Sequence, residues 1–337
     1  RTDAGAMSGP AVTVLLPVFN GARHLRESLG SVLAQRFTDF ELLVVDDGST
    51  DETPEILASI PDPRLRVVRN DGNIGLVATL NRGLAEARGE WIARQDADDI
   101  SAPGRLAAQM AFVRGNPSVP VLGTDAWLIA GDGRSCGRWR TGGHADLVAW
   151  DLCFRAPFAH ASVLFRRSII VERFGGYRDA RACEDLELWS RVAAEFPVVT
   201  LREPLVKYRL HDGSIMANTA TDLKRMDTVK EVLKRYMRAV SPGFGLAEAE
   251  RIAQVWSGGK PESWASYFAA VKELELGFSR GRRMPSGFCR LLAEQYYALF
   301  FRERRQRIIF LRALAAAEPG ILPRMPWARM LATLVLR

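Results

Sequence analysis

Short apolar runs alternate with helical patterns along the first part of this chain. The apolar runs are rich in β-branched residues, as buried strands are, and cover residues 12–19, 40–45, 65–68 and 90–93. Between them, leucines recur at helical spacing. Successive strands joined by helices pair in parallel, because a parallel pair needs a long crossover connection. The sequence therefore predicts an α/β fold, with a mostly parallel central sheet and helices on both faces.

The pattern of the sequence changes after about residue 212, where long helical patterns replace the alternation of strand and helix patterns. They cover residues 221–240, 247–255, 263–276 and 288–317. We therefore expect an α/β domain over residues 11–215 and a helical region over 216–337. Residues 1–10 are expected to form a disordered start, of which 1–6 resemble an expression-tag remnant before Met7.

Composition limits the partners of the chain. The net charge of +7 favours polyanions: anionic membranes, nucleic acid or phosphorylated substrates. No nucleic-acid-binding motif accompanies the charge, so we expect no nucleic-acid partner. The four cysteines form no CxxC pair, which indicates buried free thiols rather than a zinc site. Without a signal peptide or a long apolar run, we expect a cytoplasmic protein.

Two C-terminal stretches combine apolar residues with arginine. Residues 288–310 and 327–336 are amphipathic or apolar and are flanked by basic side chains. Such segments can lie on an anionic bilayer, which would place the protein at the inner face of the membrane. The alternative is that this stripe packs on the rest of the chain or on a second subunit of a homo-oligomer.

Three acidic clusters follow or precede predicted elements. Asp46-Asp47 and the run from Asp96 to Asp99 follow apolar strands, and Glu184-Asp185 precedes an amphipathic helix. In an open α/β sheet, ligands bind at the carboxyl ends of the strands. Carboxylates gathered there repel one another, which indicates a divalent cation, a nucleotide or general-base chemistry.

Each acidic cluster has a structural alternative. Asp96 and Asp98 form a D-x-D triplet that can hold Mg²⁺ or Mn²⁺ together with a diphosphate, or can be a solvated, helix-capping loop. Asp46 and Asp47 can accept hydrogen bonds from a nucleoside, or only shape a turn. Glu184 and Asp185 can include a general base, or only interact with the helix dipole.

The first strand exit and the histidines narrow the chemistry. Residues 20–23 match neither a G-x-G-x-x-G nor a P-loop pattern, so oxidoreductases and P-loop NTPases lose support. His211 lies in a loop near the end of the α/β region, and His160 precedes a predicted strand at 161–165. For both, a metal or phosphate role competes with a structural one. His24 and His144 are interpreted as surface residues.

Taken together, these motifs resemble glycosyltransferase family 2, the inverting enzymes of the GT-A fold. The resemblance extends from Val12 to about Ser214. It is carried by segments in the family's order: 14–21, 44–51, 73–76, 81–84, 93–99, 175–178, 184–189 and 208–211. The helical region after about Asp212 matches nothing general in the family, and it is where adaptation to an acceptor or a membrane is expected.

The resemblance implies a role for each matching residue. Asp47, with Asp46, would recognise the nucleoside of a nucleoside-diphosphate sugar, and Asp185 would deprotonate the acceptor hydroxyl with Glu184 orienting it. Asp98 would bind Mn²⁺ or Mg²⁺, with Asp96 near the ribose and the metal and His211 assisting. The other residues expected at the donor are Pro17, Phe19, Asn73, Arg94 and His160.

The implied activity is metal-dependent transfer of a sugar to a hydroxyl of a saccharide or lipid-linked acceptor, in surface polysaccharide or glycolipid biosynthesis. A UDP-sugar is the first choice of donor. Two alternatives stay open. A nucleotidyltransferase would share the nucleotide fold and the metal carboxylates but should carry a glycine- and lysine-rich phosphate loop. A non-catalytic nucleotide-sugar-binding or scaffolding protein would bind donor without turnover.

Overall fold

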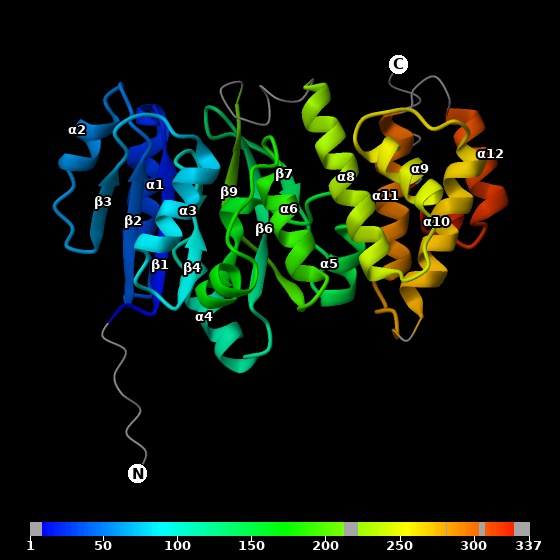
Figure 1. The fold of residues 1–337 in the computed structure, drawn as a ribbon, viewed down its shortest axis with the longest axis horizontal. Helices are drawn as coiled ribbons and strands as arrows, with labels where there is room; N and C mark the ends of the chain where they lie inside the picture. The colour runs from blue at the N-terminus through cyan, green and yellow to red at the C-terminus, as the bar shows by residue number, and fades with distance from the viewer. Residues whose placement is uncertain (1–8, 212–221, 281, 303–306, 327–337) are drawn as a thin grey trace, which may run out of the picture. The chain divides into compact units, whose positions relative to one another are not determined.

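The chain divides into two compact units. In the computed structural model, which describes residues 9–211, 222–280, 282–302 and 307–326, one unit consists of residues 1–143 with 156–222 and the other of 144–155 with 223–337. The first unit is the α/β part, coloured from blue to green in Figure 1, and the second is helical. The expected domain boundary at 215/216 took no account of residues 144–155, which belong with the helical unit.

A nine-stranded sheet forms the first unit, in the order β3-β2-β1-β4-β8-β6-β9-β5, with β7 paired to β6. Its strands are β1 (Val12–Val18), β2 (Phe40–Asp46), β3 (Leu65–Arg69), β4 (Trp91–Arg94), β5 (Ile100–Ser101), β6 (Val121–Ala130), β7 (Ser135–Trp139), β8 (Leu164–Arg166) and β9 (Val198–Leu210). The pairings among β1 to β4 are parallel. β8 is antiparallel to β4 and to β6, so the sheet is more mixed than predicted although the α/β class is confirmed.

Helices cover both faces of this sheet (Figure 1). They are α1 (Ala22–Leu33), α2 (Thr53–Ala58), α3 (Leu76–Glu86), α4 (Arg105–Gly115) and α6 (Glu184–Ala193), with a 3₁₀ turn η1 (His160–Ser162) and a π turn η2 (Ile169–Arg173). Strand β1 shows why two faces are covered, because alternate side chains point to opposite sides. Val14 and Leu16 pack in the core formed with α1, α2 and α4. Leu15 faces α3 on the other side of the sheet. Gly83 of α3 approaches it so closely that a Cβ added at Gly83 would lie 2.3 Å from Leu15 Cδ1.

The second unit is built from α5 (Ala145–Asp151), α8 (Leu223–Val240), α9 (Leu246–Trp256), α10 (Trp264–Ser279), α11 (Phe288–Arg302), α12 (Arg307–Ala317) and the 3₁₀ turn η3 (Leu322–Arg324). Aromatic contacts hold α5 in this unit, because the Trp150 ring lies 5.3 Å from Phe278 and 5.1 Å from Phe288. A buried polar chain adds to this: the Trp150 indole donates to Gln295, whose amide donates to Asp151. These contacts explain why 144–155 belongs with residues that follow it by about a hundred positions.

The apolar stripe of α11 is part of the interior of the helical unit. Leu292, Tyr296, Leu299 and Phe300 are each at most 2% exposed. This burial supports the packing alternative for residues 288–300 over membrane contact. The second stretch, residues 327–336, lies outside the described residues. Within the part of the chain that the structure describes, no helix is both long and apolar enough to span a bilayer.

The structure tests the predicted burial of the cysteines and the predicted exposure of His144. Cys153 and Cys183 are buried as expected, but Cys136 and Cys289 are exposed, because β7 and the outer side of α11 face solvent there. His144 is a surface residue as predicted, with a side chain 58% exposed.

Candidate active site

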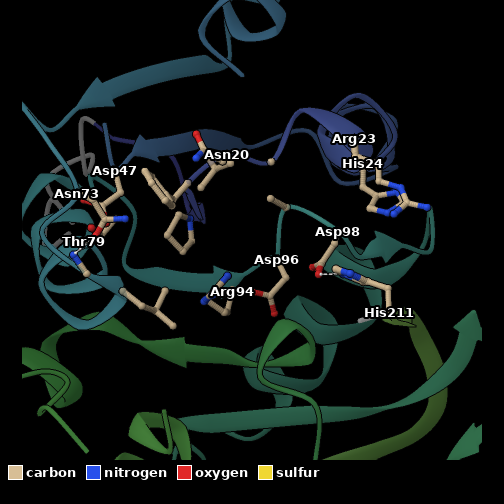
Figure 2. A pocket seen from close by; sticks show the side chains of 17 residues that line it. Asn20, Arg23, His24, Asp47, Asn73, Thr79, Arg94, Asp96, Asp98 and His211 are labelled. Atoms are coloured by element: carbon tan, nitrogen blue, oxygen red, sulfur yellow. Dashed lines mark hydrogen bonds and ion pairs between the residues drawn. The ribbon is translucent and has the colours of Figure 1, made fainter. Parts of the chain in front are cut away.

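A cavity of about 530 Å³ opens where β1, β2 and β4 end. Figure 2 shows Asp47, Asn73 and Thr79 at one end, Asp98 and His211 at the other, and Arg94 with Asp96 between them. The residues that line it are Pro17, Val18, Phe19, Asn20, Gly21, Arg23, His24, Asp47, Asn73, Gly75, Leu76, Thr79, Arg94, Asp96, Ala97, Asp98 and His211. The carboxyl edge of the sheet is therefore hollowed, as the positions of the acidic clusters predicted.

Asp47 shapes one end of this cavity. Its Oδ1 accepts hydrogen bonds from Asn70 Nδ2 at 2.6 Å and from the amide of Ile74 at 3.0 Å. Its Oδ2 accepts from the amide of Gly75 at 3.0 Å. The carboxylate thus holds the loop before α3 against the end of β2 and keeps Asn73 at the cavity wall.

Asp46 lies beneath the cavity and outside its wall. Its side chain is 2% exposed, its Oδ1 accepts from the amide of Ser49 at 2.9 Å, and its Oδ2 lies 3.5 Å from Arg69. The same turn is fixed by Asn20, whose Oδ1 accepts from the amide of Thr50 at 2.8 Å. Because β2 continues through Asp46, alternation directs only one of the two neighbouring aspartates into the cavity.

Arg94 and Asp96 form the middle of the site. Arg94 Nη2 donates to Asp96 Oδ1 at 2.7 Å, and its Nη1 donates to the backbone carbonyl of Gln95. Burial raises the pKa of Asp96, and the charge of Asp98 adds to that rise while Arg94 opposes it. The backbone carbonyl of Asp96 accepts from Ser28 Oγ at 2.7 Å, which ties the D-x-D loop to α1.

Asp98 and His211 meet at the other end of the cavity. His211 Nε2 lies 2.8 Å from Asp98 Oδ2, the contact drawn as a dashed line in Figure 2. Among the described residues, no group of three histidine, cysteine or acidic side chains is arranged to hold a metal. A nucleotide-bound Mg²⁺ or Mn²⁺ needs only one or two protein ligands, because diphosphate oxygens and water complete its coordination. The partly exposed Asp98–His211 pair fits such an ion.

Arg209 fixes the position of this pair. Its Nε donates to the carbonyl of Asp98 at 2.8 Å, its amide donates to Asp99 Oδ1 at 2.8 Å, and its Nη2 pairs with Glu27 at 2.6 Å. Asp99 therefore joins the loop to β9 instead of capping α4, which begins only at Arg105. One arginine links the D-x-D loop, the end of β9 and α1.

A second acidic centre lies outside the cavity wall, at the first turn of α6. Glu184 is mostly buried, and burial together with the charge of Asp185 raises its pKa to about 7. His160 Nδ1 lies 4.0 Å from Glu184, and His160 Nε2 lies 2.9 Å from the Tyr177 hydroxyl. Burial lowers the pKa of His160 well below its usual range, and the charge of Arg94 lowers it further. Asp185 is half-buried and accepts a hydrogen bond from the amide of Leu186.

The loop that carries Tyr177 is held from two sides. Asn81 of α3 accepts from the Tyr177 amide and donates to its carbonyl, both at 2.9 Å. Arg191 of α6 donates to the carbonyls of Phe174 and Gly176 and pairs with Glu187. The separate sequence segments around 81, 177 and 187 are therefore one structural element that positions His160 and Glu184.

The structure brings most predicted donor residues to one cavity and leaves others at a distance from it. Pro17, Phe19, Asp47, Asn73, Arg94, Asp96, Asp98 and His211 line it, whereas Asp46, His160, Glu184 and Asp185 do not. Prediction missed the polar lining residues Asn20, Arg23, His24 and Thr79 and the remaining lining positions, which are apolar or glycine. His24 was expected on the surface, but its ring lies 5.5 Å from that of His211. A lone histidine on a helix gives no sign of this contact, which depends on α1 lying beside the end of β9.

Comparison with known proteins identifies the family. A model described as "Glycosyl transferase family 2" matches residues 13–170. EpsE of Bacillus subtilis, a provisionally assigned glycosyltransferase, is 34% identical over 208 residues, which are 60% of this chain and 74% of that protein. The chain belongs to glycosyltransferase family 2. The O-antigen biosynthesis glycosyltransferase WbnJ of Escherichia coli is 29% identical over 208 residues, covering 60% of this chain and 81% of WbnJ.

Solved structures agree with the GT-A fold expected for this family 2 member. S. aureus TarS 1–349 in complex with UDP-GlcNAc has a TM-score of 0.58 at 18% identity and covers 92% of both chains. The mannosyltransferase PcManGT of Pyrobaculum calidifontis, in complex with GDP-Man and Mn²⁺, has a TM-score of 0.53 at 19% identity and covers 92% of this chain and 86% of its own. At these identities the likeness shows the fold.

Proposed function

We propose that the protein is a metal-dependent, inverting glycosyltransferase that moves a sugar from a nucleoside diphosphate to an acceptor hydroxyl. The observation that carries this is the pair of acidic centres on either side of Arg94. One centre, Asp96 and Asp98, lines the cavity, and the other, Glu184 and Asp185, starts α6. Arg94 acts electrostatically on Asp96 and on Glu184, so the two centres belong to one site.

Each group then has a role in the transfer. The end of the cavity at Asp47, Asn73 and Thr79 would take the nucleoside, and Asp98 with His211 would hold the ion beside the diphosphate. A bound divalent cation neutralises charge on the departing nucleoside diphosphate. An imidazole beside a carboxylate favours a transition ion such as Mn²⁺ over Mg²⁺.

Asp185 is the proposed general base. A carboxylate can accept the proton of an acceptor hydroxyl as its oxygen attacks the anomeric carbon, and attack opposite the leaving group inverts that carbon. Glu184, whose pKa is raised to about 7 by burial and by Asp185, carries a proton below that pH and lowers the local repulsion. His160 stays neutral there and orients Glu184 and Tyr177.

The substrates are proposed from what similar proteins bind or make. TarS was crystallised with UDP-GlcNAc and PcManGT with GDP-Man and Mn²⁺, which supports a nucleotide-sugar donor, with a UDP-sugar as first choice. WbnJ acts in O-antigen biosynthesis, which supports a saccharide or lipid-linked acceptor in surface polysaccharide assembly. Contact with the inner face of a membrane now depends on residues 327–336, because the stripe of α11 is buried.

Donor cleavage followed by proton NMR tests this proposal. The protein would be incubated with Mn²⁺ and, in turn, UDP-glucose, UDP-N-acetylglucosamine, UDP-galactose and GDP-mannose. We expect slow cleavage of one donor class even with water as acceptor, with the inverted anomer appearing before mutarotation. Appearance of the retained anomer first would contradict inversion. Metal-dependent nucleotide binding without any cleavage, with or without added glycosides, would instead support the non-catalytic alternative.

A further inference from the structure

Trp139 of β7 and Tyr208 of β9 form an aromatic corner beside β6. In the register of β6, Ala126 pairs with Trp139 of β7 and with Val206 of β9, and Leu128 pairs with Gly137 and with Tyr208. Residues two apart on a strand share a face. Trp139, Tyr208 and Leu128 therefore stand on one face of the sheet, and all three are half-buried.

The two rings meet edge to face above a small apolar cluster. Trp139 and Tyr208 have centroids 6.0 Å apart and planes at 85°. They pack against Ala126, Ala159, Ala161 and Val206, three of which carry only a methyl group. Gly137, at φ 140°, adds no side chain, and a Cβ placed there would meet nothing within 4 Å. Each ring therefore keeps part of its surface exposed, and there is open space at position 137 next to Trp139.

This corner is continuous with the proposed catalytic groups. Ala159 and Ala161 flank His160, which contacts Tyr177 and faces Glu184. Burial raises the pKa of Tyr208, and the carboxylates of Asp96 and Asp185 add to that rise. Both the donor-side acid and the proposed base are therefore within electrostatic reach of the Tyr208 hydroxyl.

The chemistry of the corner indicates what it binds. A pyranose ring presents several C–H groups on one face, and that apolar face stacks on aromatic rings, whose faces carry negative charge. The carboxylates that help to raise the pKa of Tyr208, among them Asp96 and Asp185, repel a phosphate or another anion. A neutral sugar ring fits this surface, and its edge hydroxyls would extend toward the acidic groups.

We propose that Trp139 and Tyr208 form the acceptor subsite and bind the apolar face of a pyranose ring beside Asp185. This rests on the proposed function and deepens it, since it makes the acceptor a saccharide and its terminal sugar the group that is recognised. Trp139 would contribute most, because its ring is the larger of the two and lies at the edge of the sheet.

Saturation-transfer difference NMR with simple glycosides tests this subsite. The probes are methyl β-D-glucopyranoside, methyl β-D-galactopyranoside, methyl α-D-mannopyranoside and methyl N-acetyl-β-D-glucosaminide, each with Mn²⁺ and UDP or GDP present. The variant is Trp139→Leu, which keeps apolar bulk but removes the aromatic face. The matched control is Trp127→Leu, because Trp127 belongs to the same strand pair but stands on the opposite face, 41% exposed beside Arg138.

We expect one or more glycosides to receive saturation on their ring C–H protons in the wild type and in Trp127→Leu. In Trp139→Leu their affinity should fall on the order of tenfold, and Tyr208→Phe should keep most of it because the ring remains. Equal binding by Trp139→Leu, equal loss in Trp127→Leu, or no saturation of any glycoside would overturn the proposal.

Thermal unfolding with and without nucleotide and Mn²⁺ separates a failure of the proposed function from a failure of the acceptor subsite. A missing nucleotide response in the wild type contradicts the proposed function. A normal nucleotide response together with glycoside binding that does not depend on Trp139 contradicts only this subsite.

Discussion

Arg94 lies 2.7 Å from Asp96 while its own side chain is only 1% exposed. A buried guanidinium is costly unless it is paired, so this contact holds the end of β4 in one arrangement. The same charge opposes the pKa rise of Glu184 and lowers the pKa of His160. Arg94 therefore acts on both acidic centres, although burial has the larger effect on the pKa of each.

Replacing Arg94 by methionine should destabilise the protein by about 3 kcal/mol, because Asp96 loses its partner and buried hydrogen bonds are lost. Arg69→Met is the matched control. Arg69 also pairs with an aspartate of the strand ends, at 3.5 Å from Asp46, but its side chain is 51% exposed, so its loss should cost less than about 1 kcal/mol. Urea unfolding measures both. Equal effects of the two substitutions would contradict the role given to Arg94.

Glu184 should make stability fall as the pH rises. Its folded-state pKa of about 7 lies above the usual 4.5, so between these values the folded protein holds a proton that the unfolded chain has released. Ionising the buried Glu184 lowers the free energy of unfolding. This loss is absent below about pH 4.5 and complete above about pH 7, where it amounts to about 3 kcal/mol at most.

Glu184→Gln removes this penalty and should be more stable than wild type at pH 8 but not at pH 4.5. His160 has the opposite slope, since its lowered pKa costs stability as the pH falls below 6.5, but both proteins share it. The difference between the two unfolding free energies, measured in urea at several pH values, isolates Glu184. A difference that does not change with pH would show that Glu184 titrates normally.

Gly48 is expected to be irreplaceable in the loop beside the donor cavity. Its φ is +74°, and an added Cβ would lie 2.6 Å from the backbone of Gly72. Gly48→Ala should therefore cost about 2 kcal/mol or more and displace the Asn73 loop, weakening nucleotide binding. Gly72→Ala is the matched control on the other side of the same contact. A Cβ added at Gly72 meets nothing within 4 Å, so this substitution should be tolerated. Thermal unfolding and nucleotide titration compare them, and a Gly48→Ala protein that matches Gly72→Ala would refute the close approach.

Asp185→Asn should abolish transfer while leaving donor binding intact, because the amide cannot accept the acceptor's proton. We expect the transfer rate to fall on the order of a thousandfold. Asp179→Asn is the control, since Asp179 is an exposed acid of the preceding loop whose carboxylate accepts from the Arg181 amide. Donor cleavage and nucleotide affinity are measured on both variants. Near-normal transfer by Asp185→Asn would remove it as the base.

Sequence patterns predicted the first four strands closely, because buried parallel strands have short apolar sequences rich in β-branched residues. They also predicted that Asp47, Asp96 and Asp98 gather at one edge. They could not distinguish Asp46 from Asp47, because that depends on β2 ending one residue later than the apolar run indicates. β9 has no such local signal for its length, because Pro204 and the charged residues 202 and 203 interrupt its apolar pattern. In the structure it continues to Leu210, with register shifts against β6 beside Asp125.

Contacts between distant segments account for the other differences. His24 was interpreted as a surface residue because nothing near it in sequence suggests His211 as a neighbour. Residues 144–155 carry no signal that their tryptophan packs with Phe278 and Phe288 of the helical unit. The corner formed by Trp139 and Tyr208 likewise depends on strand register across β6, which no local pattern reveals.

Asp98 is proposed to help hold a metal ion against a nucleoside diphosphate in the cavity of the α/β unit. The most direct test is thermal unfolding of wild type and Asp98→Ala with UDP, GDP and dTDP, each with and without Mn²⁺. Asp132→Ala, a change at an exposed aspartate of the β6–β7 turn, serves as control. A ligand at about a hundred times its Kd stabilises the folded state by about 2.7 kcal/mol. We predict that one nucleotide raises the melting temperature only when Mn²⁺ is present, in wild type and Asp132→Ala but not in Asp98→Ala. No response to any nucleotide, or a response that Asp98→Ala retains in full, would contradict a metal-dependent nucleotide site at Asp98.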